Sequence, residues 1–539
     1  MIPLRPVPRR VARAASLLVL LAWTATMGVL VRKAWSSSPA ALATDLAGYA
    51  GSAQWRGIYY RGDKIGFSVG QTTPVPGGFE MREDGRLQMT LLGATTAVRM
   101  SGRARVDEAF RLRTFSFSLD PGTGPTEVRG SLENGTRLVL TVRTPSGERS
   151  ETRDLPEPPA LALNLPRLLA ARGLRPGTET TVAVFDPLTM RNTPMTLRVG
   201  PREVVRAAGR PVPAFVVESR FSGITTRSWI TDVGEIVREE SPMGLLTVRE
   251  TPEQAQALAV PGAVQTDLLE AAAVSPSRPL RIDDPTTVER LRVRLSGLEA
   301  FDAADLDGDG QTRTADVLEV RDPRDLTPGP APADLDRYLK AEPFLESDAP
   351  EIRAEAAKAV AGASDPRLRA ERLVRHVHSI LEKRPTISLP SALEVLKTRV
   401  GDCNEHTALY VAMARAAGVP ARVATGLVQL RGAFYYHAWP EVFVGPSPGR
   451  GAWTAVDPTL DQFPADATHV RLARGGLDRQ AAIVSMVGRA KLDVLDVTLR
   501  PGAVPVLVGR AANDTRPLDL PLPRRDGGGC WSSPPRSSR

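Results

Sequence analysis

Three residue types that are suited to nucleophilic catalysis occur in order in the second half of this 539-residue chain. Cys403 stands in "RVGDCNEHTALYVAMARAAGVPARVATG", His437 in "GAFYYHAWPEVFVG" and Asp457 in "GAWTAVDPTLDQFP". A thiolate can attack a carbonyl carbon, an imidazole can shuttle the proton, and a carboxylate can fix the imidazole tautomer. This chemistry requires elements that bring the three side chains together.

Cys403 is expected in the first turn of an amphipathic helix. Asp402 is a favourable N-cap residue, and Glu405, three positions later, completes a capping-box pattern. Apolar residues recur at helical spacing until Gly418 and Pro420 end the pattern. The N–H groups and the dipole at a helix start favour a thiolate. A buried cysteine that acts as a small hydrophobic residue would occupy the same place, so Cys403 alone does not decide the function.

His437 and Asp457 are expected on neighbouring strands. Alternation places His437 on one face of its strand with Trp439 and Glu441, and it places Asp457 on one face of the next strand with Trp453. Antiparallel pairing of these strands would bring the imidazole beside the carboxylate. A helix packed against them would then supply the thiol.

The blocks "GDCNEHTALYVAMARAAGVPARVATG", "YYHAWPEVFV" and "WTAVDPT" resemble those of the bacterial transglutaminase-like superfamily, in the order Cys, His, Asp. The resemblance covers residues 341–475. It implies a papain-like α+β core, with Cys403 as nucleophile, His437 as general base and acid, and Asp457 as the orienting carboxylate. The expected function is a thiol enzyme that cleaves or transfers acyl groups of amide bonds through a Cys403 acyl-enzyme. Water as acceptor would make it a protease or amidase, and an amine would make it a transglutaminase.

Two other interpretations of these residues stay open. One is a non-catalytic binding or assembly module that keeps the transglutaminase-like fold. The other is a zinc site, although the sequence lacks a paired ligand motif such as C-x-x-C or H-E-x-x-H, and no cofactor or metal is therefore expected. The zinc-ligand types available in this region are Cys403, His406, His437, Asp457 and His469. Of these, His406 is expected on the helix surface or behind the site, and His469 is expected to be structural or to line a groove.

The acidic segment "DAADLDGDGQTRTAD" matches the pattern of a calcium loop. Asp305, Asp307, Asp309 and Gly310 fit D-x-D-x-D-G, with Asp316 instead of glutamate at position twelve. An EF-hand needs flanking helices, whereas "TVERLRVRLSGLE" and "ADVLEVRD" on the two sides indicate strands. We expect a β-hairpin with an acidic loop that does not need calcium; bound calcium is the alternative.

The N-terminal segment predicts membrane attachment. A basic flank over residues 1–13 precedes an uncharged, mostly apolar run over residues 14–31, long enough to span a bilayer. Arg32 and Lys33 close the run, which favours an anchor over a signal peptide cleaved after "ALA" at 41–43. The denser positive charge before the run keeps the N-terminus in the cytoplasm. The chain is therefore expected to be a single-pass bacterial inner-membrane protein whose bulk lies in the periplasm.

Composition divides the rest of the chain. Residues 51–255 contain short β-rich runs bounded by turn residues, with one helix in "LALNLPRLLAARGLRPG". Residues 32–50 and 256–330 are interpreted as linkers, the second with a β-hairpin, 331–500 as the transglutaminase-like domain and 501–539 as a disordered tail. The expected fold class is multidomain, with a mostly antiparallel β domain followed by an α+β papain-like core.

The charge pattern restricts the class of partner. Lysine and arginine number 69 against 61 acidic residues, a net charge of +8, and the sequence contains no block of like charges. Such interspersed charges indicate an arginine-rich composition instead of a nucleic-acid-binding surface. The expected partners are a peptide or protein amide substrate and the membrane, and not nucleic acid. The two cysteines are too few for a disulfide framework.

Overall fold

The computed structural model describes residue 49 and residues 53–501, except 92–93, 123, 146, 222–223, 242–243, 258–272, 279–281, 385–390, 448, 476–485 and 487–489. The N-terminal flank, the predicted membrane helix at 14–31, most of the linker at 32–50 and nearly all of the tail at 501–539 lie outside the described residues. Within the described part of the chain, no helix is both long enough and apolar enough to cross a bilayer.

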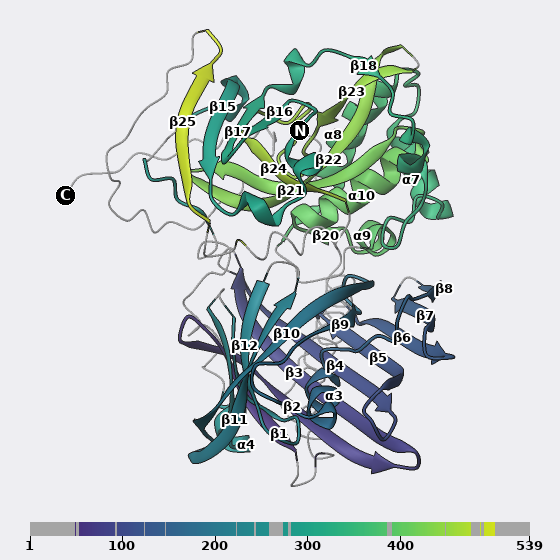
Figure 1. Ribbon diagram of the computed structural model, residues 1–539. Helices are drawn as coiled ribbons and strands as arrows, with labels where there is room; N and C mark the ends of the chain where they lie inside the picture. Colours follow the sequence, from purple (N-terminus) through teal and green to yellow (C-terminus); the bar gives the residue numbers. More distant parts are fainter. Residues whose placement is uncertain are drawn as a thin grey trace, which may run out of the picture. The chain divides into compact units, whose positions relative to one another are not determined.

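The first part is an antiparallel sheet of 14 strands in the order β8-β7-β6-β5-β4-β3-β2-β1-β14-β13-β12-β11-β10-β9 (Figure 1). Pairing of β1 with β14 joins the two halves of the sheet, so β8 and β9 form its edges. Side-chain alternation explains the strands: in β7, Leu138 and Leu140 are fully buried while Arg137 and Arg143 are exposed. The elements are β1 (Gln54–Tyr60), β2 (Asp63–Val75), β3 (Gly78–Leu91), β4 (Ala94–Val106), β5 (Leu112–Asp120), β6 (Thr126–Glu133), β7 (Arg137–Thr144), β8 (Gly147–Asp154), α3 (Leu165–Arg172), β9 (Glu179–Asp186), β10 (Arg191–Ala207), β11 (Arg210–Phe221), β12 (Ile224–Ile230), β13 (Ile236–Glu240), β14 (Leu245–Glu250) and α4 (Pro252–Gln256).

The C-terminal region begins with a four-stranded sheet in the order β16-β17-β15-β25. Its strands are β15 (Val288–Leu295), β16 (Gln311–Thr314), β17 (Val317–Arg321) and β25 (Leu492–Leu499). Residues 288–321 were expected to form a hairpin within a linker, and the hairpin is present, but β15 also pairs with the distant strand β25. The apolar face of β15, including Leu291 and Val293, packs in one core with Leu427 and Phe434. This segment is therefore part of the folded C-terminal region, because an isolated hairpin would leave that face in water.

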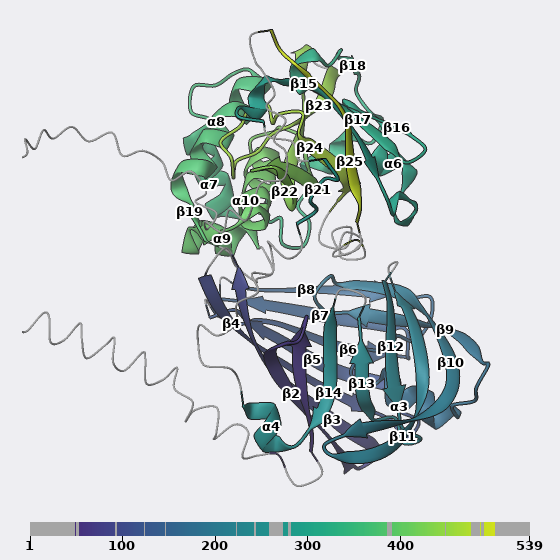
Figure 2. The ribbon, with the colours of Figure 1, turned by 90° about the vertical axis from the view of Figure 1, so that its left-hand side faces the viewer.

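A five-stranded antiparallel sheet, in the order β18-β23-β22-β21-β24, forms the centre of this region. Helices α7, α8 and α9 surround α10 near one end of the sheet, and β15, β17 and β25 lie at the other end (Figures 1 and 2). The elements are α7 (Pro350–Ala359), α8 (Pro366–Ile380), α9 (Ala392–Thr398), α10 (Cys403–Ala416), β18 (Gly329–Pro330), β21 (Ala421–Leu430), β22 (Ala433–Ser447), β23 (Arg450–Ala455) and β24 (His469–Arg474). The multidomain class, an antiparallel β domain followed by an α/β region, is confirmed.

Helix α10 is the central helix of the region. Every residue from Glu405 to Arg415 is buried, which is typical of a helix that is covered on all sides. Two short parallel strands, β19 (Glu382–Lys383) and β20 (Val400–Gly401), lead the chain into its first turn. The N-terminus of α10 is thus fixed by packing as well as by its cap.

A close approach of β24 to β21 depends on glycine. Gly426 of β21 lies opposite His437 of β22, and it also pairs with Arg471 of β24, next to an irregularity in the register. A Cβ atom at Gly426 would lie 2.0 Å from the carbonyl oxygen of Val470. Only glycine therefore allows β24, whose first residue is His469, to run this close to β21 and His437.

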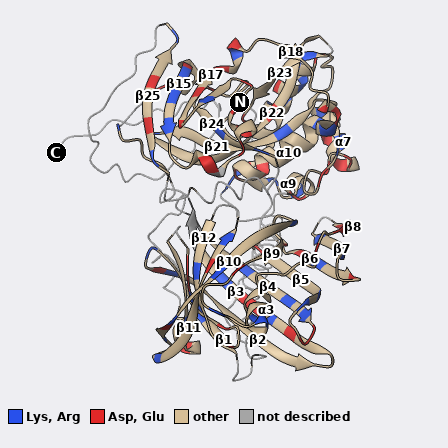
Figure 3. Cartoon of the chain, in the orientation of Figure 1, with Lys and Arg blue, Asp and Glu red and all other residues tan. Residues whose placement is uncertain are grey.

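Basic and acidic residues are interspersed along the strands in the view of Figure 3. Several of them pair across neighbouring strands, such as Arg290 with Asp496 at 3.0 Å and Arg292 with Glu319 at 3.5 Å. Pairs with this exposure contribute little to stability. The pattern is that of a mixed, solvated surface.

Candidate active site

Cys403 is the first residue of α10 and is half-buried. The carboxylate of Asp402 accepts a hydrogen bond from the backbone N–H of Asn404 at 2.9 Å. The carboxylate of Glu405 accepts one from the backbone N–H of Asp402 at 2.8 Å. The predicted capping box is therefore confirmed, and it sets the position of the cysteine at the helix start.

Helix α10 is attached to the edge of β22 at Ala438, the residue that follows His437. The hydroxyl of Thr407 donates to the carbonyl oxygen of Ala438 at 3.1 Å, and the N–H of Ala438 donates to the sulfur of Cys403. Cys403 and Thr407 are four residues apart and so share one helix face. Among the described strands, β23 pairs with β22 only from Glu441 onward, which leaves this edge for the helix. The sulfur thus lies beside the backbone of the His437–Ala438 segment.

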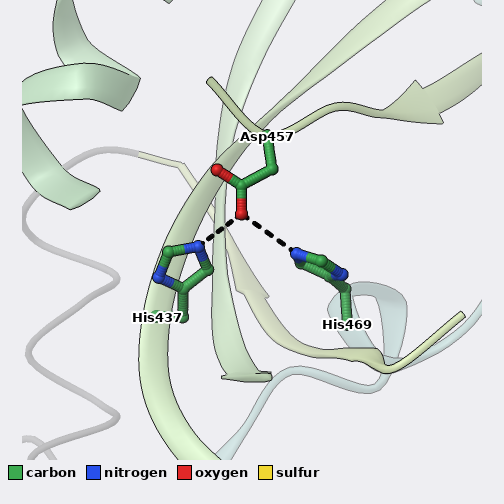
Figure 4. A group of neighbouring side chains, drawn as sticks. All are labelled: His437, Asp457 and His469. Atoms are coloured by element: carbon green, nitrogen blue, oxygen red, sulfur yellow. Dashed lines mark hydrogen bonds and ion pairs between the residues drawn. The ribbon is translucent and has the colours of Figure 1, made fainter. Parts of the chain in front are cut away.

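His437 and Asp457 are brought together as the strand alternation predicted. The Nε2 atom of His437 lies 2.7 Å from Oδ2 of Asp457, and the second ring nitrogen points away from this carboxylate (Figure 4). Glu441 of β22 pairs with Ala455, the last residue of β23, and Asp457 follows two residues later, where its backbone bridges to Gln462. The free nitrogen, Nδ1, is the one available to a thiol.

The carboxylate of Asp457 is fully buried and accepts four hydrogen bonds. Its Oδ1 atom accepts from the N–H groups of Thr459 at 2.7 Å and Leu460 at 3.0 Å, while Oδ2 accepts from His437 and from His469. Burial alone would raise the pKa of Asp457, but the charge and hydrogen bonds of the two histidines hold this pKa well below its usual range. Asp457 is therefore ionised, and its low pKa makes it too weak a base to take up a proton near neutral pH.

His469 is the residue that sequence reasoning left without a defined role. Its Nε2 atom lies 3.1 Å from Oδ2 of Asp457 (Figure 4), and its Nδ1 atom lies 3.1 Å from the carbonyl oxygen of Asp466. Burial opposes a charge here, but the hydrogen bonds to Asp457 and Asp466 raise the pKa of His469 to about 10. The ring is therefore an imidazolium at neutral pH. The only sequence signal was a histidine followed by a short β-rich run, which is too general to assign a role.

Two further groups lie near Asp457. His406 is fully buried instead of lying on the helix surface. Its Nδ1 donates to the carbonyl oxygen of Asp402 at 2.7 Å. Burial lowers the pKa of His406 to about 4. Lys383 of β19 is half-buried, and burial lowers its pKa, while Asp457 and Asp461 favour its charge. Asp457 is thus surrounded by one neutral and several basic groups.

The protonation state of Cys403 differs from the simple expectation for a helix start. Burial raises the pKa of the thiol well above its ordinary value, the carboxylate of Asp402 adds to this, and the N–H of Ala438 acts in the opposite direction. The resting cysteine is therefore a neutral thiol. Attack by this thiol would require a base to remove its proton, and His437 directly precedes Ala438 in β22.

The same stretch of chain matches a known family. Residues 353–458 match the family model of the transglutaminase-like superfamily. The C-terminal part of this chain carries a transglutaminase-like domain. The match includes Cys403, His437 and Asp457, so the resemblance drawn from the three sequence blocks is confirmed.

Individual relatives are distant. The uncharacterized proteins Rv2569c of Mycobacterium tuberculosis (strain ATCC 25618 / H37Rv) and Mb2599c of Mycobacterium bovis (strain ATCC BAA-935 / AF2122/97) are each 33% identical over 91 residues, which is 15% of this chain and 29% of each relative. The match thus spans less than a third of their length. A solved "putative cysteine protease" from Cytophaga hutchinsonii is 16% identical, covering 45% of this chain and 84% of that one, with a TM-score of 0.26. A β-barrel-like DUF1849 protein from Brucella abortus is 13% identical, covering 37% and 95%, with a TM-score of 0.29.

One group in the transglutaminase-like domain has the composition of a metal site. His437, Asp457 and His469 offer ligand atoms that lie within 4.8 Å of one another. These atoms already serve one another as donor and acceptor at 2.7 and 3.1 Å, whereas zinc would need to replace both N–H protons and sit about 2.0–2.1 Å from each nitrogen. The arrangement fits a hydrogen-bonded chain better than it fits a zinc centre.

The acidic loop that resembles a calcium site is held by arginines. The carboxylate of Asp309 accepts from Arg422 at 2.8 Å and from Arg474 at 2.7 Å, and Arg471 donates to the carbonyl oxygen of Asp307 at 3.3 Å. A one-turn helix, α6 (Ala303–Leu306), lies at the start of this segment, and the strands expected on its two sides are present as β15 and β17. Guanidinium groups thus bind the carboxylate of Asp309, one of the groups that a calcium ion would need. That the loop does not need calcium stays a prediction.

Proposed function

We propose that the transglutaminase-like domain is a thiol enzyme that acts on amide bonds through an acyl-enzyme on Cys403. One observation carries the proposal: a buried, ionised Asp457 bonds one nitrogen of His437 at 2.7 Å, while the adjoining Ala438 N–H bonds the Cys403 sulfur. The thiol, the imidazole and the carboxylate thus come from three elements that meet at one edge of β22. Such a chain is what nucleophilic catalysis by cysteine requires.

The proposed reaction has two halves. In the first, the sulfur of Cys403 attacks the carbonyl carbon of the amide while its proton passes to Nδ1 of His437. Asp457 stabilises the imidazolium, and the backbone N–H of Cys403, at the start of α10, donates to the oxyanion. The imidazolium then gives its proton to the leaving amine, the C–N bond breaks, and a thioester remains on Cys403.

The second half restores the enzyme. A water molecule or an amine attacks the thioester carbon and gives its proton to His437. The C–S bond then breaks, and the sulfur of Cys403 takes the proton back. Water yields a carboxylic acid, and a primary amine yields a new amide; the substrate class is a peptide or protein amide in both cases. The geometry of Cys403, His437 and Asp457 serves both acceptors.

We also propose that this enzyme works outside the cytoplasm of a bacterium, attached to the inner membrane by the apolar run at residues 14–31. The support is the sequence alone: a basic flank, an uncharged run of spanning length, and fewer positive charges after the run than before it.

The reaction is tested with the full-length chain and a general protein substrate. Denatured casein is incubated with the enzyme and a fluorescent primary amine, and both new peptide N-termini and amine incorporation are measured. Hydrolysis predicts the first product and acyl transfer predicts the second, and Cys403→Ala should abolish either one. Products that persist in Cys403→Ala would refute the proposal.

One observation favours a second candidate, a non-catalytic binding module. Burial raises the pKa of the Cys403 thiol, and a neutral thiol with no effective base nearby would be unreactive. The alkylation rate of Cys403 with iodoacetamide separates the two candidates. A rate at pH 7 that falls in His437→Ala supports the enzyme, whereas a rate that rises only above about pH 8.5 and ignores His437 supports the module.

A further inference from the structure

His469 is buried and bonds the same carboxylate oxygen of Asp457 as His437 does. It is 4% exposed, and both of its ring nitrogens face aspartates: Nε2 lies 3.1 Å from Asp457 Oδ2, and Nδ1 lies 3.4 Å from Asp466 Oδ1 and 3.1 Å from the Asp466 carbonyl oxygen. A neutral ring can donate from only one nitrogen, so two acceptors require the imidazolium form. The geometry alone therefore places a positive charge behind Asp457.

The second aspartate is itself held in place. Oδ2 of Asp466 accepts from Gln462 at 2.7 Å, and its Oδ1 accepts from the N–H of Thr468 at 2.8 Å. Asp466 is 5% exposed, so it cannot turn to solvent and release the ring. His469 is thus clamped between two buried carboxylates.

The charge of His469 affects how Asp457 interacts with His437, because both imidazoles bond the same Oδ2 atom of Asp457. His437 lies 2.7 Å away and His469 lies 3.1 Å away, on the same oxygen (Figure 4). A carboxylate that faced His437 alone would draw a proton strongly onto that ring. A permanent charge on His469 weakens this pull, and its ring centre is only 5.9 Å from that of His437.

We propose that His469 is a positioning residue of the Cys403–His437–Asp457 site, an imidazolium that shares the charge of Asp457 and thereby limits how tightly His437 holds a proton. The inference rests on the proposed function. An acid–base catalyst works best when its proton affinity is matched to the working pH, because it must both take the thiol proton and return it to the leaving amine. His469 provides this match without touching the substrate.

Other charged groups around the pair do not replace this role. Lys383, from β19, also acts on Asp457, but its Nζ atom makes no hydrogen bond to this carboxylate and its charge also acts on Asp461. His406, from α10, is neutral at working pH because burial lowers its pKa to about 4. The Cys403 thiol on the same helix is neutral in the resting state. His469 is the fully buried positive charge that directly bonds Asp457 among the described residues.

The test replaces His469 with glutamine in the full-length chain. His469→Gln places an N–H donor where Nε2 now faces Asp457 but removes the charge. Two charges about 6 Å apart at an effective dielectric constant of about 20–40 shift a pKa by roughly one to two units. Histidine-selective ¹⁵N NMR should therefore show the His437 titration midpoint moving up by about one to two pH units. The limb of the acylation pH profile that His437 controls should move in the same direction.

The matched control is His376→Gln, at a histidine of α8 that pairs with Glu355 at 2.7 Å, outside the site. This variant should leave the His437 midpoint unchanged. An unchanged or lowered midpoint in His469→Gln would overturn the inference. If His469→Gln does not fold, the NMR spectrum of the wild type provides the test. At least one of the five histidines should still be an imidazolium at pH 8, and this signal should persist in His376→Gln. Five neutral histidine rings in the wild type would overturn the inference.

The NMR result is independent of turnover. A wild-type chain that never acylates while its His437 midpoint still shifts in His469→Gln would defeat the proposed enzyme and leave the charge coupling in place. An active enzyme whose midpoint does not shift would defeat the role of His469 alone.

Discussion

Substitution of Asp457 by asparagine changes one heavy atom of a side chain that accepts four hydrogen bonds, and it disturbs two of them. The two backbone N–H groups that face Oδ1, from Thr459 and Leu460, require an acceptor. The amide oxygen must therefore occupy the Oδ1 position, and the amide NH2 must then face His437 and His469. The variant thus presents an N–H donor to two rings that, in the wild type, donate to Oδ2 of Asp457.

The tautomer of His437 should change as a result. With an N–H group opposite Nε2, the ring is stable only when its proton sits on Nδ1, the nitrogen that the thiol of Cys403 needs as a base. Loss of the correct tautomer and of the stabilising charge costs a triad enzyme roughly a thousandfold to ten-thousandfold in rate. At about 1.4 kcal/mol per tenfold, this corresponds to about 4–5.5 kcal/mol of lost transition-state stabilisation. His469 also loses one of its two carboxylates, and breaking a buried pair costs roughly 3–5 kcal/mol of folding stability.

The assay is the second-order rate of Cys403 acylation by p-nitrophenyl acetate at pH 7, followed by nitrophenolate release, with circular dichroism to confirm folding. The matched control is Asp461→Asn, four residues along the same segment, whose carboxylate pairs with Arg375 at 2.7 Å and is partly exposed. That variant should react like the wild type. A folded Asp457→Asn that acylates within about threefold of the wild type would refute the assigned role of Asp457.

Three further predictions concern the rest of the chain. The free energy of unfolding should fall as pH rises from about 6.5 toward 10, by at most about 1.4 kcal/mol per pH unit. The reason is that His469 has a pKa of about 10 in the folded state and about 6.5 in the unfolded state, so its stabilising charge is lost across this window. Urea unfolding of His469→Gln should lack this pH dependence, and a profile identical to that of the wild type would contradict the assignment. Millimolar calcium should leave the Tm unchanged, because Arg422 and Arg474 bind the Asp309 carboxylate of the acidic loop. A rise of several degrees that a chelator reverses would show a calcium site. Protease added to spheroplasts should digest the C-terminal domain of the full-length chain, and full protection would rule out the proposed topology.

Much of the site followed from local pattern. The capping box of α10 depends on residues three positions apart, and the shared face of His437 and Asp457 follows from strand alternation, so both could be predicted from sequence. Joining the three blocks into one site needed the family resemblance, because no local rule predicts that α10 packs against the open edge of β22.

What sequence could not supply was set by distant packing. The role of His469 depends on Asp457, 12 residues earlier, and on Asp466, three residues earlier, and no local rule predicts how the turn between them brings these groups together. The strands at 288–321 were assigned to a linker because their partner, β25, lies about 200 residues downstream. Cys403 was expected to favour a thiolate from its place at a helix start, but burial in the folded domain dominates and raises its pKa.

The central claim is that Cys403 forms the acyl-enzyme with His437 as its base. The most direct measurement is mass spectrometry of the full-length chain after brief treatment with p-nitrophenyl acetate at pH 7, with digestion to locate the acetyl group. We expect one adduct, on the peptide that carries Cys403, that is lost in Cys403→Ala and strongly reduced in a folded His437→Ala. An adduct located elsewhere, or one that forms equally fast in His437→Ala, would contradict the account.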